Sequence, residues 1–210
     1  MKRPFILVFL ALLLAGTLAS AGQVDFGISV SDGRLRGFYL AVGEHYRVAP
    51  RLVVDYRTRY RLLDEELPLV FFLAARAHVG PQAVIDLRLA KLSWLAIALR
   101  LRLSPEIFFL PVMAERVGPP YGNAYGYYRK YGRAGDWSRL VLSDREVVDL
   151  VNLRFMSEYH GLGPDEIIVL RGRHRTFIGI HDELGRGQGW GDRGKAPKAA
   201  AAPRGKGKKK

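Results

Sequence analysis

An internal repeat without gaps constrains this chain more than any other feature of its sequence. The first copy runs from Pro81 to Ala98 and the second from Pro164 to Ile180. The matched residues are Pro81, Val84, Ile85, Leu87, Arg88, Ser93, Trp94 and Ile97 in the first copy, and Pro164, Ile167, Ile168, Leu170, Arg171, Thr176, Phe177 and Ile180 in the second. Similarity of this kind is typical of supersecondary units that bury a shared core by packing on one another. The sequence therefore predicts one body made of repeated units.

A third, partial copy lies upstream, from Pro50 to Arg57. Val53, Val54 and Tyr56 are in place, but the downstream aromatic residue is missing. In residues 53–60, Tyr and Val alternate with Asp and Arg, which fits either a helix or a short strand. The pattern therefore does not distinguish a helix from a strand in this segment.

Helix-start signals favour helices in the two full units. Acidic residues precede each copy, at 64–66 and at 144–146, where the helix dipole favours negative charge. Pro81 and Pro164 each follow a glycine, and proline suits the first helical position because its missing N–H would be unpaired there. We therefore predict a mainly α-helical fold in which each unit is tri-helical: helix, turn, helix, turn, helix.

The N-terminus has the basic, apolar and small-residue parts of a secretory signal peptide, over residues 1–21. We expect cleavage after Ala21 and export to the periplasm or exterior of a bacterial-type cell. The remaining apolar runs are shorter than the roughly 20 residues that a spanning helix needs, so we expect no transmembrane helix in the processed chain. The sequence has no cysteine, which excludes disulfide bonds.

Residues 22–184 are expected to form one domain. Its parts would be a partial unit at 38–62, a full unit at 63–117, a glycine- and tyrosine-rich connection without a helix at 118–138, and a full unit at 142–184. Residues 24–30 alternate in polarity and would form a short strand or a loose arm. Residues 185–210 have too few apolar side chains for a core, and we predict a disordered tail.

Most of the positive charge belongs to this tail. It has nine basic residues against one acidic residue, whereas residues 22–184 have 22 basic against 19 acidic residues. A basic arm would attract an anionic polymer or lipid surface. The residues expected to bind it are Lys195, Lys198, Arg204, Lys206, Lys208, Lys209 and Lys210. The alternative is a tail that only keeps the protein soluble.

The connection at 118–138 interleaves aromatic and basic residues. Such residues can stack on sugars or nucleobases. The candidate stacking residues are Tyr121, Tyr125, Tyr127, Tyr128, Arg129, Lys130 and Tyr131. The alternative is that the tyrosines pack this segment onto the helices.

One run resembles the helix-turn-helix of DNA-binding regulators. It comprises Leu87-Arg88, Leu92-Ser93-Trp94, Ile97-Ala98 and Leu103-Ser104-Pro105-Glu106-Ile107. The resemblance implies nucleic-acid binding as an alternative function. The presumed recognition helix departs from the pattern, however, because it continues as Phe108-Phe109-Leu110-Pro111 and offers no polar side chains to base edges.

Histidines near helix ends suggest two metal clusters, His45 with His78 and His160, and His174 with His181 and Asp182. A protonated histidine at a helix C-terminus is favourable without a metal, and neither group has a standard ligand spacing, so we predict no metal or cofactor. The sequence also lacks a nucleophile motif and a phosphate-binding glycine loop. We expect a non-catalytic exported protein.

Overall fold

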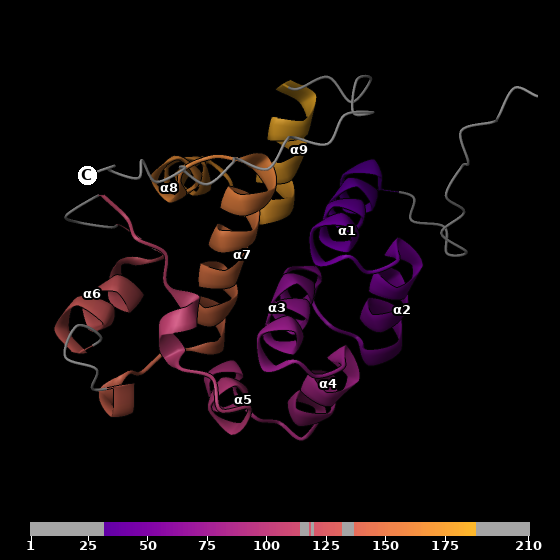
Figure 1. The fold of residues 1–210 in the computed structure, drawn as a ribbon. Coiled ribbons are helices and arrows are strands. Elements are labelled where there is room, and N and C mark those ends of the chain that lie inside the picture. Colours follow the sequence, from indigo (N-terminus) through magenta and orange to yellow (C-terminus); the bar gives the residue numbers. More distant parts are fainter. Residues whose placement is uncertain (1–31, 114–117, 119, 132–136, 188–210) are drawn as a thin grey trace, which may run out of the picture.

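The computed structural model describes residues 32–113, 118, 120–131 and 137–187. These residues form helices joined by short turns, with no strand among them (Figure 1). The prediction of a mainly α-helical fold is confirmed. The predicted signal peptide, the segment at 24–30 and the tail beyond Gly187 lie outside the described residues.

The helices follow in chain order, with short 3₁₀ turns (η) between some of them. They are α1 (Gly33–Tyr46), α2 (Pro50–Tyr60), η1 (Asp64–Glu66), α3 (Leu67–Ala77), α4 (Pro81–Leu89), α5 (Trp94–Arg100), η2 (Pro105–Phe108), α6 (Gly122–Tyr131), η4 (Trp137–Arg139), α7 (Asp144–His160), α8 (Pro164–Arg173) and α9 (Phe177–Gly187). Residues 53–60, for which the sequence allowed either a helix or a strand, are helical because they belong to α2. The last helix ends at Gly187, three residues beyond the expected boundary at Leu184.

The turns α1–α2, α3–α4 and α7–α8 share one geometry. Each begins with a residue in the left-handed region, at φ between 55° and 68°. These residues are Arg47, His78 and Gly161. The N–H of the next, apolar residue bonds to a carbonyl five residues back, which closes the preceding helix as in a Schellman motif. A proline then starts the next helix two residues later. The partial copy and both full copies therefore share this turn.

The core lies where α3 and α7 pack side by side (Figure 1). α3 is buried from Leu67 to Ala74, since it has neighbours on several sides: α1, α4 and α7. α9 packs against α1 and α7, while α5 packs against α7. Aromatic rings join these layers, with Phe38 of α1 edge-on to Phe155 of α7 at 5.8 Å.

Both full units contain the same group of three side chains: a carboxylate, an arginine and an aromatic ring. In the first, Arg88 is 3.1 Å from Glu66 and lies 4.7 Å from the centre of the Trp94 ring. The second group occupies matching repeat positions, with Asp149, Arg171 and Phe177. Its ion pair measures 3.5 Å, and the guanidinium lies 5.2 Å from the ring.

Trp94 and Phe177 are both fully buried. Arginine over an aromatic ring is a cation–π contact, and here it also neutralises a buried acid. From the repeat we predict that residues 64–107 superpose on residues 144–184.

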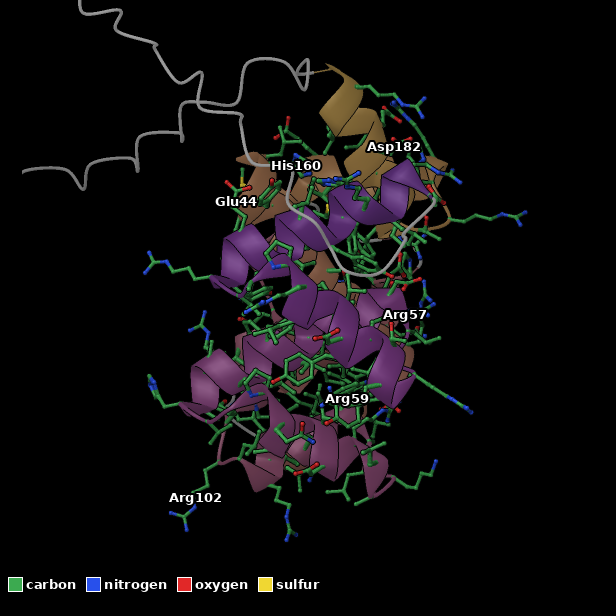
Figure 2. All side chains as sticks on the ribbon, turned by 90° about the vertical axis from the view of Figure 1, so that its right-hand side faces the viewer. Glu44, Arg57, Arg59, Arg102, His160 and Asp182 are labelled. Carbon is green, nitrogen blue, oxygen red and sulfur yellow. The ribbon has the colours of Figure 1, made fainter. Side chains whose placement is uncertain are left out.

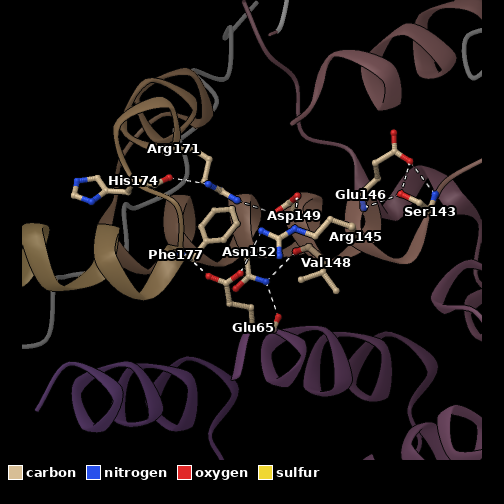
Figure 3. Close-up of polar contacts among 10 residues, drawn as sticks. All are labelled: Glu65, Ser143, Arg145, Glu146, Val148, Asp149, Asn152, Arg171, His174 and Phe177. Carbon is tan, nitrogen blue, oxygen red and sulfur yellow. Dashed lines mark hydrogen bonds and ion pairs between the residues drawn. The ribbon is translucent and has the colours of Figure 1, made fainter. Parts of the chain in front are cut away.

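The two units also exchange helix caps. The backbone N–H of Trp94, which opens α5, donates to Asp144 of the second unit at 2.8 Å. The N–H of Phe177, which opens α9, donates to Glu65 of the first unit at 2.6 Å (Figure 3). Because N-terminal amides of a helix are otherwise unpaired, each unit supplies an acceptor that the other needs.

A polar junction surrounds this exchange (Figure 3). It is formed by the largely buried side chains of Glu65, Asp149, Asn152 and Arg171 and by the exposed Arg145. Asp149 is 1% exposed and lies between Arg145, at 3.0 Å, and Arg171. The amide of Asn152 donates to the Glu65 carbonyl at 2.7 Å and so ties α7 to the start of α3. The charges of the junction are engaged with one another, which indicates a structural role.

Replacing Trp94 should destabilise the fold severely. Trp94→Ala removes a fully buried ring and the bond from its Nε1 to Glu66, and we expect a loss of about 3 to 5 kcal/mol in the free energy of unfolding. Trp94→Phe keeps most of the volume and should lose clearly less. Urea unfolding followed by circular dichroism measures both. Equal losses for the two variants would contradict this account of the site.

The Glu65 carboxyl should make stability depend on pH. Burial raises its pKa above the usual 4.5, so its ionised form is less favourable in the folded than in the unfolded chain. The contribution of Glu65 to stability is therefore greatest at low pH and falls as pH rises through and above 4.5. The neutral Glu65→Gln keeps an acceptor for Phe177, so its stability relative to the natural chain should increase from pH 4 to pH 7. Unfolding curves across this range test the sign, and a relative stability that decreases with pH would refute it.

Candidate functional site

The expectation that residues 118–138 contain no helix is wrong, because Gly122–Tyr131 forms α6. One face of this helix carries Ala124, Tyr125 and Tyr128, spaced as helical neighbours, and Tyr121 just precedes it. These side chains pack on the core cluster, and this burial outweighs the low helix propensity of the glycines. The spacing was visible in the sequence.

The predicted stacking residues divide between two faces of α6. Tyr121 and Tyr125 are buried, and Tyr128 stacks on Phe109 with ring centres 4.5 Å apart. The Tyr125 hydroxyl donates to the Leu110 carbonyl at 2.9 Å, and burial raises the pKa of Tyr125 to about 12. For these three tyrosines, the packing interpretation is the correct one.

The remaining predicted residues face outward. Tyr127, Arg129 and Lys130 are exposed, and Tyr131 stacks on Tyr127 with ring centres 6.2 Å apart. Tyr127 and Lys130 line a hollow of about 600 Å³ between α6 and the start of α7, which we call the α6 groove. Its other lining residues are Gly122, Asn123, Gly126, Val141, Leu142, Ser143 and Glu146.

A second candidate surface is the exterior of α2 to α5, which we call the basic exterior. Residues 47–102 contain ten basic residues, of which Arg57 and Arg88 are paired with acids. The other eight are exposed: Arg47, Arg51, Arg59, Arg61, Arg76, Lys91, Arg100 and Arg102. Figure 2 looks onto α1 and α2, and it shows Arg59 on this face and Arg102 projecting from its lower edge.

Few acids balance these exposed bases. Of the five acids in residues 47–102, Glu65 and Glu66 are buried and Asp64 pairs with Arg57 at 3.0 Å. Only Asp55 and Asp86 remain on the outside of this part of the chain. Residues 137–187, in contrast, contain eight acids and seven bases. The exposed positive charge of the folded body is thus concentrated in residues 47–102.

Large apolar side chains accompany the exposed bases. They are Leu52, Leu63, Leu89 and Leu99, with exposed fractions of 42%, 69%, 51% and 54%. All four lie between residues 47 and 102, so the basic exterior offers both charge and apolar contact. Sequence reasoning missed this surface because it summed charge over the whole domain and did not separate the buried acids from the exposed bases.

The part of the chain that resembles a helix-turn-helix lacks an exposed recognition helix. The segment assigned to it is the short 3₁₀ turn η2, in which Pro105 and Phe108 are buried, and Phe109 after it is buried too. A surface that reads base edges needs polar side chains on an element that enters the groove. This segment packs into the core.

The histidines do not assemble as the metal hypotheses required. His45 lies 3.4 Å from Glu158, and His160 lies 3.1 Å from His181. His174 contacts Glu183, and Asp182 pairs with Arg186 at 2.7 Å. Among the described residues, no three His, Asp or Glu side chains are placed to hold a metal ion.

Within the described ranges, no single helix is long and apolar enough to cross a membrane. The segments Asp64–Ala77 and Pro81–Leu89 would be long and apolar enough only if taken together. The chain bends by 119° between them.

Comparisons of the chain with protein-family models, with curated proteins and with solved structures find no match. The assignment of function therefore depends on the surfaces described above.

A glycine in α6 tests the helix that the sequence reasoning did not expect. A Cβ at Gly126 would have no atom within 4 Å, and alanine forms helices better than glycine. Gly126→Ala should therefore raise the free energy of unfolding, by up to about 1 kcal/mol. Thermal unfolding measures the change. Gly126→Pro should destabilise the fold, and a Pro variant as stable as the Ala variant would argue against a helix here.

Proposed function

We propose that this chain is an exported, non-catalytic protein that binds anionic material of the cell envelope. The basic tail and the basic exterior would bind together. The observation that carries the proposal is the uneven charge of the folded body, in which eight exposed bases of residues 47–102 stand against Asp55 and Asp86. Export is supported by the signal-like composition of residues 1–21.

We expect the binding to an anionic surface to be strong because many weak contacts of basic residues add together. A basic residue close to an anionic membrane contributes about 1 kcal/mol, and salt screens this attraction. Several bases on a rigid surface act at once, and the tail adds nine more. The exposed leucines favour a lipid surface over a soluble polymer, because apolar side chains gain by burial at the boundary between headgroups and acyl chains.

Vesicle binding tests the proposal directly. The protein from Gly22 onward should bind vesicles that contain anionic phospholipid, bind vesicles of zwitterionic lipid far less, and lose at least about tenfold in affinity as salt rises to physiological levels. Sedimentation with vesicles measures each affinity. Truncation after Gly187 should weaken binding without abolishing it.

Charge reversal on the truncated chain separates the folded surface from the tail. The triple variant Arg51→Glu, Arg59→Glu, Arg102→Glu should remove the remaining binding. A matched control reverses Arg139, Arg173 and Arg175, which are exposed but lie outside the basic exterior, and it should bind more tightly than the triple variant. If the triple variant binds as well as this control, the folded body contributes no specific surface.

The second candidate function is nucleic-acid binding, which the same bases would also support. Because η2 offers no base-reading helix, such binding would depend on phosphate contacts and would be insensitive to sequence. Duplex DNA of two unrelated sequences, titrated under the same salt conditions, distinguishes the candidates. Tighter binding to DNA than to anionic vesicles would favour the alternative.

The cellular location provides an independent test. Fractionation with N-terminal sequencing should find the protein outside the cytoplasm and starting at Gly22. Retention in the cytoplasm with Met1 intact would contradict export and favour the nucleic-acid alternative.

A further inference from the structure

We infer that the α6 groove binds an uncharged saccharide segment of a glycan. The inference goes beyond the proposed function, because it concerns a different surface and a neutral ligand. In Figure 1, α6 and α2 lie on opposite sides of the α3–α7 pair, so the groove and the basic exterior face different surroundings.

One stripe of α6 supplies the groove with a mixed set of contacts. Asn123, Gly126, Tyr127 and Lys130 follow one another at helical spacing and line the same side. The stripe runs from Asn123 to Lys130, and the seven steps between them measure roughly 10 Å at the rise of an α-helix. That length suits a short run of sugar rings, and the volume of about 600 Å³ lies within the usual range of ligand sites.

The aromatic part of the groove is an exposed ring with support behind it. Tyr127 is 36% exposed, and its ring stacks on Tyr131 with planes 21° apart. The Lys130 ammonium lies 5.0 Å from the centre of the Tyr131 ring. This cation–π contact helps to hold the Tyr131 ring in place. A tyrosine ring offers an apolar face with a polar edge, a combination that suits the C–H face and the hydroxyl rim of a sugar.

The glycine in the middle of the stripe leaves space for a ligand. A Cβ built at Gly126 meets no atom within 4 Å. A larger residue there would project into the groove without displacing the core, and the groove can therefore be blocked selectively.

The polar residues of the groove balance in charge and match hydroxyl groups. Lys130 contributes a positive charge and Glu146 a negative one. Oε2 of Glu146 accepts from the Ser143 N–H at 2.8 Å, and the carboxylate has a second oxygen that can accept from a hydroxyl. The Asn123 amide can both donate and accept. A nucleic acid would instead place phosphates near Glu146, which would repel them.

The experiment uses three neutral tetrasaccharides as probes: a chitin fragment, a cellulose fragment and a starch fragment. Titration into the full chain is followed by NMR and calorimetry. At least one probe should bind and should shift amide signals in residues 122–130 and 141–146. Tyr127→Ala should weaken that binding about tenfold.

A second variant keeps the result interpretable. Gly126→Leu should block the groove, whereas Gly172→Leu makes the same substitution at an exposed α8 position that also has open space, and it should bind like the natural chain. The inference is overturned if none of the probes binds at 10 mM. It is equally overturned if Gly126→Leu binds as well as Gly172→Leu, or if a single-stranded oligonucleotide binds the groove more tightly than every probe. Vesicle binding should be unchanged in Tyr127→Ala, so failure here leaves the proposed function standing.

Discussion

The exchange of helix caps between the two units is the constraint on which the rest of the fold depends. Asp144 caps α5 and Glu65 caps α9, so neither unit has its full set of backbone acceptors alone. The exchange places Glu65 where only 11% of its side chain is exposed, and the burial of this carboxylate would be unfavourable without partners, whereas Asp144 is 38% exposed. Arg88 and Arg145 supply these partners from either side. Removal of Arg88 would leave the buried Glu66 without its ion pair. The contacts of these acidic residues link the start of α3 to α5, α7 and α9.

The same exchange shapes the outer surface. Residues 22–184 have nearly balanced charge, with 22 basic against 19 acidic residues. Their surface is unevenly charged because folding buries Glu65 and Glu66, pairs Asp64 with Arg57, and leaves most neighbouring bases in solvent. Arg88 is engaged twice, with Glu66 and with Asp144 at 2.6 Å, and therefore adds nothing to the exterior. The basic exterior is thus a consequence of the core, and it could be recognised only after the partner of each acid was known.

The sequence predicted the parts of the fold that local chemistry specifies. The prolines at 81 and 164 each start a helix as predicted, and Ser143 with Glu146 forms a capping box at the start of α7. Trp94 and Phe177, which the sequence aligned with each other, are both fully buried. The α6 helix was missed because the five glycines and two prolines of residues 118–138 suggested a connection, whereas its stability comes from contacts with Phe109 and Leu110 that composition does not reveal. The candidate stacking residues that pack against the core could have been recognised by their helical spacing. The α6 groove could not, because one of its walls is the start of α7, whose position relative to α6 the sequence does not reveal.

The left-handed residues that end the helices provide a last argument about the basic exterior. Five of these positions within the described part of the chain are not glycine, and all five carry basic side chains: Arg47, Arg61, His78, Lys91 and Arg102. A side chain in the left-handed region costs roughly 1 to 2 kcal/mol, and glycine avoids this cost, as Gly161 does at the matching turn of the second unit. A base near a helix C-terminus regains only about 0.3 to 1 kcal/mol when exposed. Stability alone therefore favours glycine at these turns. The bases are better explained by what they present to the solvent, and four of the five belong to the surface proposed to bind anionic material.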